Sequence, residues 1–330
     1  MTQFIIGSIY NFDFKERFIL QGEVMSINFL NAHTNTEALI DHSYFLKGIG
    51  EIEKQEMLRS SLHFSQYSFD SEGATKSEAE QLAAILLAIQ KYQTQTLLIS
   101  LWLIKDNSVN TSNFFYFDSE REHIIRDSPT ILFSSSKGEY IQTSFSEEEI
   151  KQAMEWQKKV IQYPSKKKNT DEDIKHIMGS VNSINNFDKR STAFEADRIS
   201  RALKMTTIAR SQSFLPAKIA SYISAIEALI SSNREALTMQ VCERVPRIIG
   251  ENKGDKIIIH DQLRDAYNIR SKYVHGDKVS ERIAQSLEEI SENIDGILRG
   301  LLIKVIKDHE EIKDFNEKSM TKWYKENFMF

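Results

Sequence analysis

The hydrophobic pattern of this 330-residue chain changes character near residue 145, and this change limits the possible folds more than any other feature. Before it, apolar residues form short runs rich in β-formers, such as Phe4–Ile9 and Asn113–Phe117, which are typical of strands. After it, isoleucines recur at three- and four-residue spacing, as in the segment 216–231, which indicates helices. The pattern therefore predicts an α+β N-terminal domain followed by an all-α helical bundle.

Within the first half, further strands are predicted over Arg17–Leu30, Thr94–Ile104 and Thr130–Ser135. One helix interrupts them over Ser77–Tyr92, where Ser77 and the glutamate three residues later form a capping box. The predicted elements come in runs instead of in βαβ order, which favours an α+β arrangement.

Residues that typically begin or end helices divide the chain further. A second capping box at Ser146 opens a helix, and Pro164 and the following polar run indicate its end and a linker. Long helical patterns then continue to a short charged and aromatic tail. We expect residues 1–145 to be a β-rich sensor or regulatory domain, 146–192 a helix and linker, 193–312 the bundle, and 313–330 a C-terminal tail.

Composition and missing motifs exclude several classes of protein. The lone Cys242 cannot form an internal disulfide, so a disulfide-framed secreted domain is excluded and a cytoplasmic protein is expected. No apolar run is long enough to span a membrane. The chain has no P-loop, dinucleotide fingerprint or paired metal-ligand motif, so no cofactor and no metal are predicted.

One run, Tyr-Asn-Ile-Arg-Ser-Lys-Tyr-Val-His-Gly at 267–276, combines two residues suited to phosphodiester chemistry. RNA cleavage without a metal needs a base for the 2′-OH proton, an acid for the leaving 5′ oxygen, and a cation for the developing charge. His275 can move protons near pH 7, and Arg270 offers a permanent charge that fits phosphate. We take these two as candidate catalytic residues.

Helix geometry restricts how these two side chains can cooperate. Five residues at about 100° each separate Arg270 from His275 by about 140° on one helix. Either His275 leaves the helix at its C-terminal cap, or two protomers bring two such pairs into one cleft. The alternative is that both residues have structural roles only. His275 would then cap the helix before Gly276, and Arg270 would pair with a nearby carboxylate, Asp265, Asp277 or Glu281.

The segment 194–306 resembles the HEPN superfamily, and within it the ApeA-like branch. The resemblance rests on Ile-Glu-Ala-Leu around Glu227, Glu-Arg-Val-Pro-Arg at 243–247, and the run that ends in Arg270, four residues and His275. It implies a helical bundle that dimerises. It also implies, as in many members, a metal-independent ribonuclease used in phage defence or as a toxin, with its Arg/His site composed at the dimer interface.

Several residues are expected to support this site. Glu227 lies on an apolar face and needs a partner, so we expect it to orient Arg270 or another arginine. The three residues Ser271, Lys272 and Tyr273 are candidate substrate contacts. Residues 190–278 carry 15 basic against 10 acidic side chains, a bias that suits phosphate binding. Three upstream arginines either line the same groove or face water: Arg198, Arg201 and Arg210.

The sequence thus leads to a specific hypothesis with an open alternative. We expect a cytoplasmic, homodimeric, metal-independent endoribonuclease that acts on RNA in anti-phage defence (abortive infection) or as a toxin. Its control by a phage-derived trigger or an antitoxin partner is part of this expectation. The alternative is a HEPN-like module that binds RNA or a nucleotide, or serves as an adaptor, without cutting.

Overall fold

A computed structural model describes residues 3–22, 25–34, 36–67, 75–129, 131–163, 196–233, 235–277 and 281–328. The chain forms two compact units, and neither is one continuous stretch of sequence. The first unit consists of residues 1–104, 109–132 and 141–194. The second consists of residues 105–108, 133–140 and 195–330.

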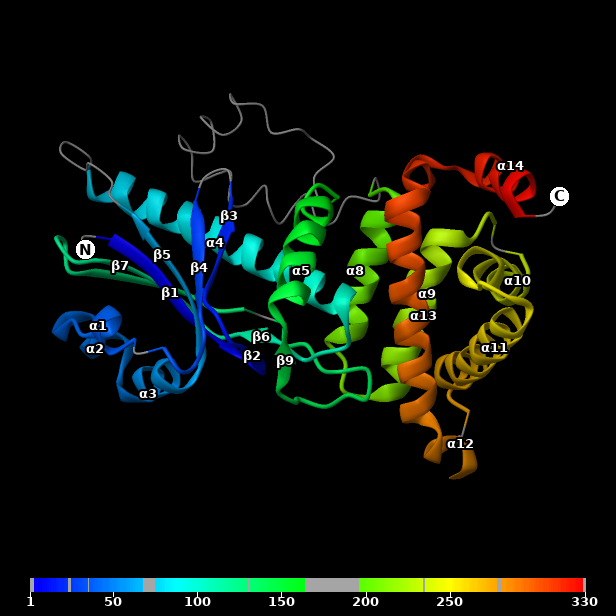
Figure 1. Ribbon diagram of the computed structural model, residues 1–330, viewed down its shortest axis with the longest axis horizontal. Helices are drawn as coiled ribbons and strands as arrows, with labels where there is room; N and C mark the ends of the chain where they lie inside the picture. The colour runs from blue at the N-terminus through cyan, green and yellow to red at the C-terminus, as the bar shows by residue number, and fades with distance from the viewer. Residues whose placement is uncertain are drawn as a thin grey trace. The chain divides into compact units, whose positions relative to one another are not determined.

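The first unit is built on an antiparallel sheet in the order β3–β4–β5–β1–β7–β8, with β6 pairing with the end of β1 (Figure 1). Strands β2 and β9 pair in parallel and form a second, two-stranded sheet. The strands are β1 Gln3–Tyr10, β2 Phe12–Phe14, β3 Phe18–Gln21, β4 Ser26–Leu30, β5 Ser61–Tyr67, β6 Asn110–Thr111, β7 Phe114–Asp118, β8 His123–Asp127 and β9 Thr143–Phe145.

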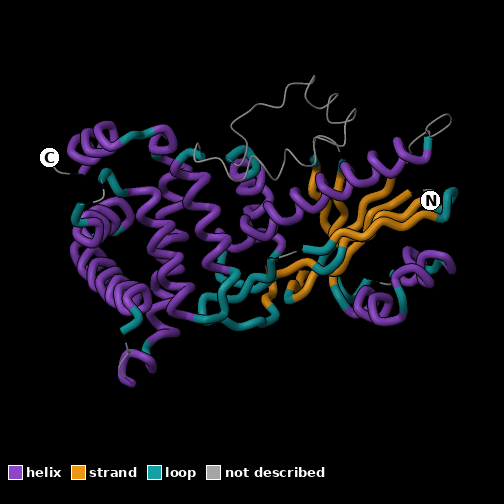
Figure 2. Tube along the Cα trace, turned by 180° about the vertical axis from the view of Figure 1, so that it is seen from behind, coloured by secondary structure: helices purple, strands orange, loops and turns teal. Residues whose placement is uncertain are grey.

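Helices cover both faces of this sheet, which explains why nearly every residue of β1 is buried (Figures 1 and 2). On one face, Phe4, Phe64 and Phe117 pack with Phe45 and Met57 from the short helices. On the other face lies the long helix α4. The helices of this unit are α1 Glu37–Ile40, α2 Ser43–Ile49, α3 Glu51–Arg59, α4 Lys76–Ile104 and α5 Glu147–Val160.

The α4 face of the sheet contains a fully buried histidine. His63 on β5 shares a 2.8 Å hydrogen bond between its Nδ1 and Nε2 of Gln90 on α4, and its ring lies 4.3 Å from the ring of Phe114. A Cβ on Gly7 would lie 2.5 Å from the His63 ring, so only glycine leaves room for it. Burial lowers the pKa of His63 to about 3, which means that the folded unit holds it neutral.

The second unit is helical and is organised around α9. Helix α9 contacts α8, α10, α11 and α13, and the isoleucine stripe of the sequence, Ile219 to Ile230, is fully buried. Its elements are α8 Arg198–Arg210, α9 Leu215–Ile230, α10 Leu237–Ile249, α11 Lys253–His275, α12 Glu281–Gln285, α13 Leu287–Asp308, the 3-10 turn η1 Glu310–Asp314 and α14 Glu317–Phe328.

A polar centre ties residues 105–108 and 133–140 into this helical unit. The fully buried Arg210 donates from Nη2 to the backbone oxygen and Oδ1 of Asn107, at 3.0 and 3.2 Å. Its guanidinium carbon lies 4.5 Å from the centre of the Phe133 ring. Nearby, both Asp106 carboxylate oxygens accept from the backbone N–H of Ser136. These two short segments therefore complete the core of the helical unit.

Charged groups of α9 and α13 extend the same centre. Tyr222 donates to Oδ1 of Asp295 at 2.8 Å, and Arg299 pairs with the other oxygen of that carboxylate. Lys218 is fully buried, with its Nζ 5.6 Å from the centre of the Tyr222 ring. Burial lowers the pKa of Lys218 to about 8.

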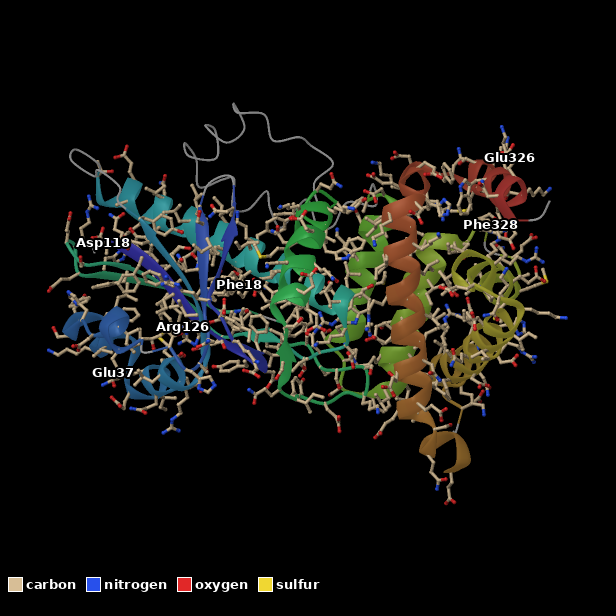
Figure 3. The ribbon with its side chains drawn as sticks, in the orientation of Figure 1. Phe18, Glu37, Asp118, Arg126, Glu326 and Phe328 are labelled. Carbon is tan, nitrogen blue, oxygen red and sulfur yellow. The ribbon has the colours of Figure 1, made fainter. Side chains whose placement is uncertain are left out.

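The predicted C-terminal tail, 313–330, contains the end of η1 and all of α14, and both elements belong to the helical unit. The ring of Phe328 lies 5.3 Å from that of Trp323, and Arg247 on α10 donates to the backbone oxygen of Phe328 at 3.1 Å. Figure 3 shows Phe328 at the end of α14, and Asp118 at the end of β7 in the first unit.

The coarse prediction of an α+β part followed by a helical part is confirmed. Two of the predicted strands are wrong: Thr94–Ile104 is the last third of helix α4, and the described residues 131–135 form a loop. The predicted strand Arg17–Leu30 is instead two paired antiparallel strands, β3 and β4. The predicted helix start at Ser77 is also displaced, because Thr75 and Glu78 form the capping interaction.

The predicted domain limits differ from the two units. Helix α5, which follows the predicted limit at 145, belongs to the first unit, and the short segments 105–108 and 133–140 belong to the second. The predicted linker at Lys166–Asn169 lies outside the described residues. The capping box at Ser146 is confirmed: its hydroxyl accepts from the N–H of Glu149, whose side chain accepts from the N–H of Ser146.

Replacing Asn107 by alanine is expected to destabilise the helical unit. The change removes the side-chain oxygen that accepts from buried Arg210, and an unsatisfied buried donor costs about 1–3 kcal/mol. The free energy of unfolding can be measured by urea denaturation. Lys137→Ala is the control, since it removes an ion pair to Glu292 that lies at the surface and contributes little to stability. Equal stability of Asn107→Ala and wild type would contradict the assigned role.

The stability of the first unit should fall in mild acid because of His63. Its pKa is about 3 in the folded chain, against about 6.5 when unfolded, so the unfolded chain binds the extra proton between these values. The contribution is fully present above pH 6.5 and decreases by about 2 kcal/mol from pH 7 to pH 5. Unfolding of wild type and His63→Gln at both pH values tests this. If His63→Gln lost as much stability between pH 7 and pH 5 as wild type does, His63 would be excluded as the source of the loss.

Candidate functional site

Helix α11 carries both candidate catalytic residues. It begins at Lys253, where the side chain of Asn252 caps it by accepting from the N–H of Asp255 at 3.0 Å. Its predicted end is confirmed. Gly276 adopts a φ of 74°, the left-handed conformation that favours glycine, and its N–H donates to the backbone oxygen of Lys272.

Arg270 is held on the side of α11 that faces α9. Its Nη2 lies 3.4 Å from Oε2 of Glu227, and the Arg270 side chain is 33% exposed while that of Glu227 is 14% exposed. The residue expected to orient Arg270 is therefore in contact with it. The pairing also corrects the alternative in which Asp265, Asp277 or Glu281 is the partner of Arg270, because the recorded ion pair is to Glu227.

Tyr267 supports the same carboxylate from one turn earlier on α11. Its hydroxyl donates to Oε1 of Glu227 at 2.9 Å, and the guanidinium carbon of Arg270 lies 6.0 Å from the centre of its ring. Burial, and then the neighbouring Glu227 carboxylate, raise the pKa of Tyr267 well above its usual value. Tyr267 thus stays a neutral donor, and both carboxylate oxygens of Glu227 have a partner.

His275 is the last residue of α11 and is exposed. It keeps the helical conformation, so the arrangement in which it leaves the helix and bends back to Arg270 is wrong. On a regular helix it lies about 140° around the axis from Arg270. One protomer therefore does not bring the imidazole to the guanidinium.

The residues between them have different surroundings. Ser271 is exposed and Lys272 is partly buried. Tyr273 is 44% exposed, and its ring centroid lies 6.0 Å from that of Phe214, the N-cap residue of α9. Of these candidate substrate contacts, Tyr273 is the one recorded in contact with another aromatic side chain.

Two of the three upstream arginines are buried and donate hydrogen bonds to backbone oxygens inside the helical unit. Arg198 donates from Nε to the backbone oxygen of Phe315 at 2.7 Å and from Nη1 to that of Ser231 at 2.8 Å. Arg210 is fully buried in the polar centre. The expectation that these two line a substrate groove or face water is wrong, since both contact backbone oxygens inside the helical unit; Arg201 is exposed.

Sequence reasoning missed two residues of this region. Tyr267 is three residues before Arg270 on one helix, and side chains at this spacing are neighbours, so its role could have been found. The role of Phe214 could not have been found from the sequence, because its contact with Tyr273 joins segments far apart in the chain.

Two searches of the described residues returned nothing. No group of three His, Cys, Asp or Glu side chains in these residues is placed to hold a metal ion. None of the helices in the described ranges has the length and apolar character needed to cross a membrane. Cys242 is buried, and burial raises the pKa of its thiol to about 11.

Comparison of the chain with protein-family models, curated proteins and solved structures found no match.

Removing the phenol of Tyr267 should weaken the support of Arg270. Tyr267→Phe and Glu227→Gln are each expected to cost up to about 1.5–3 kcal/mol, the contribution of a hydrogen bond to a charged group. The double variant should cost less than the sum, because both changes weaken the same hydrogen bond. Urea denaturation of the four proteins measures this.

The matched control is Tyr140→Phe, which removes a phenol from a 53% exposed tyrosine of the same unit. It is expected to change stability by less than about 0.5 kcal/mol. Strict additivity of the Tyr267 and Glu227 changes would contradict a shared interaction.

Proposed function

We propose that this protein is a metal-independent endoribonuclease of the HEPN type, active as a homodimer. The observation that carries the proposal is the support of Arg270, which lies near the end of α11 and five residues before an exposed histidine: the Glu227 carboxylate contacts its guanidinium and itself accepts from the Tyr267 hydroxyl. A guanidinium has five N–H donors. One donor faces Glu227, which leaves others for a phosphate.

The proposed reaction needs no water and no metal. The imidazole of His275 takes the proton of the ribose 2′-OH as the 2′ oxygen attacks phosphorus. The bond to the 5′ oxygen breaks, and that oxygen takes a proton from the partner subunit's His275. The products are a 2′,3′-cyclic phosphate and a 5′-hydroxyl. Arg270 stabilises the charge that develops on the phosphoryl oxygens.

The placement of the two residues on α11 favours a site shared between subunits. Because Arg270 and His275 lie on different sides of one helix, a phosphodiester that meets both groups needs a second copy of the helix. A two-fold axis near the ends of two α11 helices would bring two arginines and two histidines into one cleft. The same symmetry supplies the second histidine that the reaction needs as an acid.

The proposed biological setting is cytoplasmic anti-phage defence, by abortive infection, or action as a toxin. In this setting the α+β unit restrains the nuclease until a phage-derived trigger binds, or an antitoxin partner provides the restraint. Two observations support the proposed restraining role of the first unit: it is a separate compact unit, and the helical segment resembles HEPN proteins.

Cleavage of a labelled single-stranded RNA by the full chain in the presence of EDTA tests the proposal. Wild type should yield products ending in a 2′,3′-cyclic phosphate. Arg270→Ala and His275→Ala should each slow cleavage by about 100-fold or more, since each removes a group that acts only in the transition state. Light scattering should give the mass of a dimer for all three proteins.

His260→Ala is the matched control, because His260 is a surface histidine of the same helix, paired with Asp261 at 3.0 Å. It should cleave at the wild-type rate. Cleavage by His275→Ala at the wild-type rate would show that the activity belongs elsewhere or to a contaminant. RNA binding by wild type without any product would favour the non-catalytic binding module.

A further inference from the structure

Two aromatic side chains lie exposed beside each other in the helical unit. Phe214 is 60% exposed and Tyr273 is 44% exposed. Their ring centroids are 6.0 Å apart and the rings are inclined at 62°. Full burial of such a ring contributes about 1.5–3 kcal/mol, so the folded chain leaves a considerable apolar surface in water here. A flat partner stacked on one ring, with the other ring against its edge, would recover part of this free energy.

The charges around the ring pair suit a phosphate-bearing partner. Tyr273 follows Arg270 by three residues on α11, so the two side chains are neighbours on one side of the helix. The first turn of α9, which Phe214 precedes, contains no acidic residue. Glu227, the carboxylate that contacts Arg270, is already engaged by Arg270 and Tyr267. Aromatic faces therefore lie next to a cation.

This combination is typical of proteins that bind single-stranded nucleic acid. Unpaired bases stack on aromatic side chains whatever their sequence, while arginines contact the phosphates between them. Bases of a duplex are stacked on one another and are not available for such contacts. The ring pair thus distinguishes an unpaired strand from a double helix.

We propose that Phe214 and Tyr273 form a stacking site for one unpaired base of single-stranded RNA, and that binding of this base positions the adjoining phosphate at Arg270. The identity of the strand as RNA rests on the proposed function. The stacking itself does not depend on cleavage. Phe214 and Tyr273 are positioning residues in this scheme, and they select unpaired segments as substrates.

The test measures binding in a background that cannot cut. A fluorescein-labelled single-stranded oligoadenylate of 12 nucleotides is titrated with full-length His275→Ala at fixed salt, and fluorescence anisotropy gives the affinity. Adding Phe214→Ala or Tyr273→Ala should weaken binding by about 5- to 100-fold, the loss expected for one stacked base. Tyr273→Phe keeps the ring and should bind as the background protein does.

Three comparisons make the result specific. Tyr140→Ala removes another exposed aromatic ring of the same unit and should leave the affinity unchanged. The affinity for a blunt RNA duplex of the same length should not respond to Phe214→Ala. Arg270→Ala should lower the salt dependence of binding, whereas Phe214→Ala should leave that dependence unchanged.

Two outcomes would overturn the proposal. The first is single-stranded RNA binding that Phe214→Ala and Tyr273→Ala leave unchanged, or no binding by the background protein. The second is conversion of a dimer to a monomer by these variants, which assigns the rings to a protein interface. Binding that depends on Phe214, in a wild-type protein that cuts no RNA, would support the stacking site and reject the nuclease.

Discussion

The burial of the Arg210 guanidinium is the constraint on which the helical unit depends. A charge removed from water is tolerated only where hydrogen-bond acceptors replace its hydration. Here the backbone and side-chain oxygens of Asn107 accept from Nη2 of Arg210, and Asn107 follows the last residue of α4 by three positions. The helices from 195 onward therefore do not enclose a complete core by themselves. The unit needs the short segments 105–108 and 133–140.

Helix α9 connects this polar centre to the candidate site. Near its first turn it places Lys218 and Tyr222 against the centre, and near its last turn it presents Glu227 to Arg270. The isoleucines between them are fully buried. Because protein interiors are closely packed, the buried helix that presents Glu227 offers it a firm position. The support of Arg270 is thus only partly exposed to solvent.

Local signals in the sequence predicted helix ends well and long-range partners poorly. Ser146, Pro216 and Gly276 act within a few residues of their own position, and each has its expected place. Thr94–Ile104 has the β-branched and apolar content of a buried strand, yet it continues a helix that starts at Lys76. A buried helix segment and a buried strand have the same apolar run, and only contact with the sheet decides between them.

The same distinction explains which parts of the candidate site were foreseen. The pairing of Glu227 with Arg270 follows from one acidic residue on an apolar helical face, which must find a cation. The burial of Arg198 and Arg210 could not be foreseen, because their acceptors are backbone oxygens of Phe315, Ser231 and Asn107. Composition gives no sign of such acceptors, since every residue has a backbone oxygen.

The geometry of α11 makes the proposed chemistry a property of an assembly. Glu227 and Tyr267 fix Arg270 toward the inside of its own unit, whereas His275 ends the helix in solvent. A fixed cation suits the stabilisation of charge, because it needs no reorganisation when the charge develops. An exposed imidazole stays accessible to a substrate and to a second copy of the chain. The two roles need different surroundings, and a helix that separates them within one chain can reunite them only across a symmetry axis.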